Sequence, residues 1–103
     1  MNANGNVGAN PHRVTLRIEK TIENGTATIR LIGRARSEHL DALCAEVQTC
    51  ASRIVTIDLA EITNLDVESV HFLSACELRG FYLINCPPFV REWIQRERET
   101  EES

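Results

Sequence analysis

Apolar and polar residues alternate over residues 14–18, which predicts a strand with one buried face. The dipeptide Asn24-Gly25 follows, and it predicts a hairpin turn because both residues tolerate positive φ. The antiparallel partner is expected over 26–32, with Gly33 at its end. The apolar residues of this alternation are Val14, Leu16, Ile18, Ala27, Ile29 and Leu31.

Apolar residues at helical spacing predict three helices further along the chain. Ser37 is expected to cap the first helix and Asp66 the second, which ends near Leu78. Gly80 suits the left-handed conformation that ends a helix, and Pro88 suits the first turn of the third helix. The apolar residues of the three helices are Leu40, Leu43, Cys44, Val47, Cys50 and Ala51, then Val70, Leu73 and Cys76, and finally Phe89, Val90, Trp93 and Ile94.

Two short apolar runs predict strands between the helices. The run 54–59 predicts a buried parallel strand, and the run 81–84 predicts a further strand. The resulting order, β-β-α-β-α-β-α, predicts a single α/β domain with a roughly four-stranded mixed sheet. This sheet starts with a β-hairpin, and the helices pack mainly on one face. We expect the domain to span 13–96, after a disordered Asn- and Gly-rich arm at 1–12 and before a polar acidic tail at 97–103.

The composition of the chain argues against several classes of partner. The net charge is −4 and the pI about 5.3, which argues against nucleic acid as a partner because phosphate binding needs clustered Lys and Arg. No pattern for a metal or a cofactor is present, and no apolar run is long enough to insert in a membrane. The four cysteines lie outside any C-x-x-C or zinc spacing, which favours a reduced, cytoplasmic protein; they are Cys44, Cys50, Cys76 and Cys86.

The polar residues after strand 54–59 are the first candidates for a binding site, because loops at the carboxyl ends of central strands form such sites in α/β folds. If the protein binds something, we expect the loop after this strand and the start of the next helix to contact it. Asp66 can cap the helix, and Glu68 either complements the helix dipole or supplies a fixed negative charge. The predicted partner-binding residues are Thr63, Asn64, Asp66, Val67, Glu68, Ser69 and Val70.

Three isolated residues invite a catalytic or modification role. His71 lies one turn from Asp66, but no nucleophile motif accompanies the pair, so we expect a surface histidine and no enzyme. Cys86 precedes Pro87, where a helix start can lower a thiol pKa; packing is the expected role. Ser69 is a possible phosphorylation site, although a Ser in the first turn of a helix is usually structural.

These motifs, taken together, resemble the STAS domain, the family of the anti-sigma-factor antagonists. The residues that carry the resemblance are Asp58-Leu59, Leu65-Asp66, Gly80, Pro88-Phe89-Val90 and Ile94, and it covers about residues 14–96. In the bacterial antagonists, the first Ser after the second Asp of this signature is phosphorylated by a kinase that is itself an anti-sigma factor. That phosphorylation ends the binding, because a phosphate adds negative charge at a helix start within the interface.

The chain departs from the family signature at the phosphorylated position. Val67 occupies the position of that Ser, Glu68 that of the next Ser, and Ser69 that of the Gly. The resemblance therefore implies a non-enzymatic interaction module of bacterial transcription regulation and signalling. It would dock on a kinase-type anti-sigma factor or similar regulator without the usual Ser switch. The alternative is a subunit or regulatory module of an ABC-type membrane transport complex, where the partner is an ATPase. A homodimer is also possible.

Overall fold

The computed structural model describes residues 16–50 and 54–102, so the predicted arm at 1–12 lies outside it. The helices and strands follow one another in the order predicted from the sequence. They are β1 (Leu16–Glu23), β2 (Thr26–Ala35), the short 3-10 helix η2 (Ser37–His39), α2 (Leu40–Gln48), β3 (Ile54–Leu65), α3 (Val67–Leu78), β4 (Tyr82–Ile84) and α4 (Pro88–Glu102).

A four-stranded mixed sheet in the order β1-β2-β3-β4 forms the centre of the fold, which confirms the predicted α/β class. β1 and β2 are an antiparallel hairpin, whereas β2–β3 and β3–β4 are parallel pairs. Asn24 and Gly25 have φ of 52° and 81°, which are the left-handed values that a two-residue hairpin turn requires. The first strand pair is therefore fixed by local turn chemistry.

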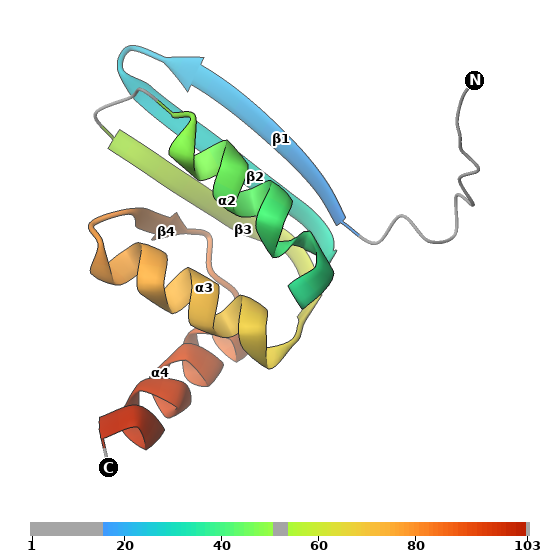
Figure 1. Cartoon of the computed structure of the whole chain (residues 1–103), viewed down its shortest axis with the longest axis vertical. Helices are drawn as coiled ribbons and strands as arrows, with labels where there is room; N and C mark the ends of the chain where they lie inside the picture. Colours follow the sequence, from blue (N-terminus) through green and yellow to red (C-terminus); the bar gives the residue numbers. More distant parts are fainter. Residues whose placement is uncertain (1–15, 51–53, 103) are drawn as a thin grey trace, which may run out of the picture.

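The helices α2 and α3 lie on one face of the sheet, and α4 packs against α3 (Figure 1). Between the sheet and the helices lies one hydrophobic core. The opposite face of the sheet is not covered by any described helix. The fully buried large residues of the core are Ile29, Leu31, Leu43, Ile57, Leu59, Leu73, Ile94, Val70 and Val90.

Strand β3 is twice as long as predicted. The sequence predicted a strand over 54–59 followed by a loop, but β3 continues to Leu65 alongside β2. Two irregularities in the β2–β3 register change the face that each residue presents, so that Leu59, Ile62 and Leu65 are buried at every third position. This three-residue spacing differs from the two-residue period of a regular strand, so the sequence pattern did not indicate a strand here. Thr63 and Asn64 therefore lie in β3, whereas a loop was expected.

The ends of several elements also differ from expectation. Gly33 does not end β2 but lies with φ of 107° at the second register irregularity. Ser37 is not a cap, because the helical segment begins with the 3-10 turn η2 and Arg36 precedes it. There, His39 Nδ1 accepts the Arg36 N–H at 3.1 Å. Asp66 caps α3 and Gly80 follows it with φ of 100°, as predicted.

Fewer residues of α4 are buried than the four that the sequence predicted, which were Phe89, Val90, Trp93 and Ile94. Val90 and Ile94 are fully buried, and Trp93 is half-buried against the core. The expected docking of Phe89 is wrong, because its side chain is 41% exposed. Val90 and Ile94 are four residues apart and form the line that faces α3, whereas Phe89 is about 100° away around the helix. Helix α4 continues to Glu102, so the segment predicted as a tail begins in this helix.

Candidate functional site

The junction between β3 and α3 is organised by Asp66. Its Oδ1 accepts the backbone N–H of Ser69 at 3.0 Å, which satisfies one of the unpaired donors in the first turn of α3. Its Oδ2 accepts the backbone N–H of Ser37 at 2.6 Å, and its own N–H donates to the Ala35 carbonyl at 3.3 Å. One side chain thus joins the start of α3 to the segment that follows β2.

The charge state of Asp66 reflects these bonds. Burial raises the pKa of the Asp66 carboxyl, but the hydrogen bonds donated by Ser37 and Ser69 outweigh burial and hold the pKa below its usual value. The ionised carboxylate is therefore the form that the junction stabilises.

Two of the predicted partner-binding residues face the interior. Ser69 is 1% exposed, and its Oγ donates to the Ala35 carbonyl at 3.0 Å. Val70 is 0% exposed and belongs to the core. These residues hold α3 against β2 and cannot contact a partner in this structure. A kinase also cannot reach the Ser69 hydroxyl, which argues against Ser69 as a phosphorylation site.

The remaining candidates form a surface at the junction. Val67 and Glu68 are exposed in the first turn of α3, and Val67 is 41% exposed. Thr63 and Asn64 are exposed at the end of β3, where Asn64 pairs with Arg34 of β2. We call this set the junction surface; it consists of Thr63, Asn64, Asp66, Val67 and Glu68. It offers hydrogen-bonding groups, one negative charge beyond Asp66 and an apolar side chain, which suits binding more than catalysis.

His71, which the sequence predicted to be a surface histidine, contacts helix α4. Its Nε2 lies 2.7 Å from Glu97 Oε1. Asp66 accepts hydrogen bonds from Ser37 and Ser69 as the cap of α3, whereas His71 projects towards α4. The histidine therefore belongs to the contact between two helices.

That contact includes a group of charged residues that the sequence did not reveal. Glu77 accepts two hydrogen bonds from Arg91, at 2.9 and 3.0 Å, and a third from Arg98 at 2.9 Å. Arg98 also donates to the Ser74 hydroxyl at 2.8 Å. The hydrogen bond from Arg91 is the main reason that the pKa of Glu77 lies below its usual value. We call the group of Glu77, Arg91 and Arg98 the clamp. The one sequence signal for it was the spacing of Arg91 and Arg98, which are seven residues apart and therefore lie on the same face of a helix.

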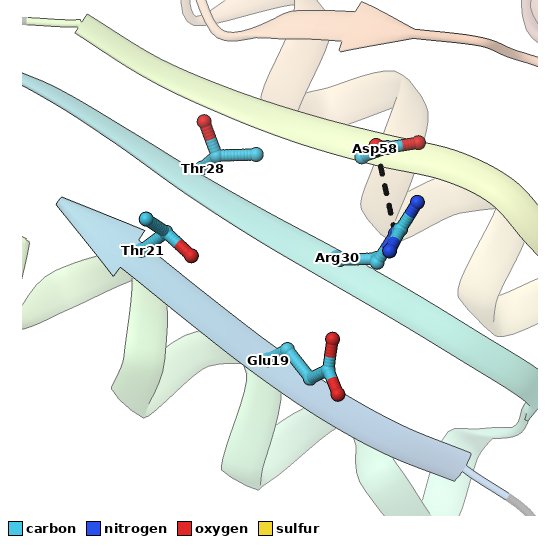
Figure 2. A pocket seen from close by; sticks show the side chains of 5 residues that line it. All are labelled: Glu19, Thr21, Thr28, Arg30 and Asp58. Carbon is cyan, nitrogen blue, oxygen red and sulfur yellow. Dashed lines mark ion pairs between the residues drawn. The ribbon is translucent and has the colours of Figure 1, made fainter. Parts of the chain in front are cut away.

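A second polar cluster lies on the uncovered face of the sheet. Figure 2 shows the side chains around a hollow of about 280 Å³, which are those of Glu19, Thr21, Thr28, Arg30 and Asp58. Arg30 Nε lies 3.7 Å from Asp58 Oδ2, an ion pair too long for a hydrogen bond. Asp58 Oδ1 accepts the Ala60 N–H at 3.0 Å and the Asn85 side-chain amide at 3.2 Å. Asp58 of β3 therefore contacts β2 through Arg30 and the segment after β4 through Asn85.

The sequence did not predict this cluster, because its residues come together only when the strands pair. Arg30 and Asp58 are 28 positions apart, and only the parallel β2–β3 register places them opposite each other. Alternation along 26–32 did indicate that Arg30 points away from the core. The opposite charges of Arg30 and Asp58 form only a long ion pair, and Arg30 Nε is buried with no hydrogen-bond partner among the described residues.

Comparison with solved structures finds the anti-sigma factor antagonist SpoIIAA in its unphosphorylated form. The TM-score is 0.58 at 19% sequence identity, and the match covers 81% of this chain and 80% of SpoIIAA. The chain has a STAS-like fold. No family model matches the sequence, and no curated protein matches it. At this identity the likeness establishes the arrangement of the STAS-like fold, and the junction surface has to be judged on its own geometry.

The four cysteines of the chain are half-buried or buried. Burial raises the pKa of Cys76 to about 11, and burial also raises the pKa of Cys86. Both thiols therefore stay protonated near neutral pH, where the thiolate is the reactive form. Cys86 packs against the core, as expected from the sequence.

Two further searches concern the described residues alone. Within 16–50 and 54–102, no group of three or more His, Cys, Asp or Glu residues is arranged to hold a metal ion. None of the helices in these ranges is long and apolar enough to cross a bilayer.

Proposed function

We propose that the protein is a non-enzymatic interaction module of a bacterial regulatory system, which docks in the cytoplasm on a kinase-type anti-sigma factor or a similar regulator. The fold is similar to that of SpoIIAA, which is an anti-sigma factor antagonist. The observation that carries the proposal is the ordered start of α3, which presents Val67 and Glu68 to solvent. The resemblance in sequence assigns position 67 to the phosphorylated Ser of the STAS antagonists.

The same geometry supports an interaction without a phosphorylation switch. Val67 has no hydroxyl to modify, and Ser69 is buried with its hydroxyl engaged by the Ala35 carbonyl. Glu68 is exposed beside Val67 and supplies a carboxyl group there without any modification. The first turn of α3 therefore keeps one chemical state, and we expect binding to be regulated by the amount of protein instead of phosphorylation in this turn.

The structure also decides which substitution tests the surface. Charge reversal at Asp66 is not a clean probe, because it removes the cap of α3 and the bond to Ser37 at once. Val67 is a better probe, since its side chain is exposed and accepts no hydrogen bond. Val67→Glu places a negative charge where phosphorylation would place one, at a helix start that tolerates it.

The first test is capture of the partner from native lysate with tagged protein, read by mass spectrometry. The baits are the wild type, Val67→Glu, and Glu92→Lys as the control on the exposed face of α4. We expect a kinase-type anti-sigma factor with the wild type and the control, and at least tenfold less of it with Val67→Glu. Equal capture by all three baits would show that the junction surface is not the interface.

A second test restores the missing hydroxyl. With the captured kinase and ATP, Val67→Ser should become phosphorylated at position 67, while the wild type stays unmodified. Phosphorylation of the wild type at Ser69 would contradict a switch-free module. Capture of a transport ATPase in place of a kinase would instead support a regulatory module of a membrane transport complex, for which the absent hydroxyl at Val67 is equally suitable.

A further inference from the structure

The strand β1 forms one edge of the sheet. β2 pairs with it on one side, and Figure 1 shows no described element along its other side. An edge strand directs alternate backbone N–H and C=O groups outwards, where another chain can pair with them. In a two-residue hairpin the residues that flank the turn, here Glu23 and Thr26, form a hydrogen-bonded pair. The outward groups of β1 therefore belong to Leu16, Ile18, Lys20 and Ile22.

The side chains of β1 carry a pattern that is complementary to itself. On the helix face, Ile22 is 59% exposed near the turn and Ile18 is half-buried towards the other end. On the opposite face, the exposed Arg17 and Glu23 carry opposite charges at the two ends of the strand. A strand of this kind matches a second copy of itself that runs in the opposite direction.

We propose that a second copy of this chain pairs with β1, antiparallel and around a two-fold axis at Lys20. The two sheets then become one continuous sheet. In this register Arg17 faces Glu23 of the second copy, and Ile18 faces Ile22 of the second copy, each twice because of the symmetry. Opposite charges and apolar pairs directly across an antiparallel pair are the combinations that stabilise it.

The charges of β1 disfavour the two nearest alternative registers, although Arg17 Nη2 lies 2.9 Å from Glu19 Oε2 within the strand. Both alternatives keep the outward backbone groups opposite one another, but they shift one chain by two residues. In one of them Glu19 faces Glu19 of the second copy, and in the other Glu19 faces Glu23. Like charges directly opposite each other destabilise a strand pair.

Lys20 faces its own counterpart at the two-fold axis. Its Nζ lies 3.1 Å from Glu46 Oε1 and 3.4 Å from Thr49 Oγ1, so the ammonium leans over α2 and away from the free edge. Glu46 neutralises its charge within each copy. The interface uses none of the residues of the junction surface, so it leaves partner binding unaffected.

The oligomeric state tests this interface directly. Sedimentation velocity of the wild type over a range of concentrations should show a reversible dimer. Glu23→Arg places a second guanidinium opposite that of Arg17 at both ends of the strand pair, and it should weaken association about tenfold. The double variant Arg17→Glu/Glu23→Arg restores opposite charges across the interface and should recover the dimer, while Glu92→Arg on α4 should leave it unchanged.

Cross-linking tests the register. Lys20→Cys meets its counterpart at the two-fold axis and should form a disulfide-linked dimer on oxidation, beyond the level of the wild type with its four cysteines. Thr21→Cys faces Glu19 of the second copy and should not. A wild type that stays monomeric at every concentration would overturn the proposal. A dimer that Glu23→Arg leaves intact, or that the double variant does not recover, would overturn it as well.

Discussion

At the scale of single residues, Asp66 connects more of the molecule than its place in the sequence suggests. It caps α3, and it also accepts the N–H of Ser37 across 29 positions of chain. The cap was predictable, because Asp before an apolar helical stripe is a common helix start. The bond to Ser37 was not, since it depends on the parallel β2–β3 pair that brings the two segments together.

Replacing Asp66 by Ala should lower the free energy of unfolding by about 2 kcal/mol, because a cap alone is worth about 1 kcal/mol and a second backbone donor also loses its acceptor. Urea unfolding at pH 7 measures the change. Glu68→Ala is the matched control in the same turn, where the side chain is exposed, and it should cost no more than about 0.5 kcal/mol. Equal losses for the two variants would mean that the carboxylate of Asp66 does not hold the junction.

At the scale of elements, the register irregularities of β3 explain the main error in the predicted fold. The hairpin and the two ends of α3 were predicted because Asn24, Gly25, Asp66 and Gly80 determine backbone conformation locally. Helix α2 was predicted because its apolar residues recur at helical spacing. The length of β3 depends on pairing with β2, which no local pattern encodes. The candidate site was affected in the same way, because Ser69 and Val70 belong to the binding segment in sequence but to the core in space.

Two substitutions in α4 test which face of this helix packs against the core. Ile94→Ala should lower the free energy of unfolding by about 2–5 kcal/mol, because it leaves a cavity in a fully buried position. Phe89→Ala should cost about 1 kcal/mol or less, since the ring is largely exposed. Chemical denaturation of both variants decides between this face and the broader one expected from the sequence. A larger loss for Phe89→Ala would show that α4 is rotated about its axis.

At the scale of the whole molecule, two carboxylates make the free energy of unfolding depend on pH. The pKa values of Asp66 and Glu77 are both lowered in the folded state. Each group therefore contributes stability that is fully present above its unfolded pKa, near 4, and is lost as pH falls through the lower folded value. Stability should change little from pH 7 to about pH 5 on account of these groups and then decline.

The pH profile of Glu77→Gln tests this explanation. Without the ionisable group, the variant should start less stable at pH 7, and its urea midpoint should fall less between pH 5 and pH 3 than that of the wild type. Glu92→Gln, exposed on α4 and away from the clamp, should keep the wild-type profile. Parallel profiles for wild type and Glu77→Gln would mean that Arg91 and Arg98 do not stabilise the ionised carboxylate.

The late position of α4 in the chain has a consequence for synthesis on the ribosome. Val90 and Ile94 complete the core, yet they are among the last described residues to be made. At about 5–20 residues per second, the 15 residues of α4 take on the order of one to three seconds to translate. Until α4 has been made and has left the ribosome, the part of the chain already outside it exposes the α3 side of its core, where a chaperone or a neighbouring nascent chain can bind.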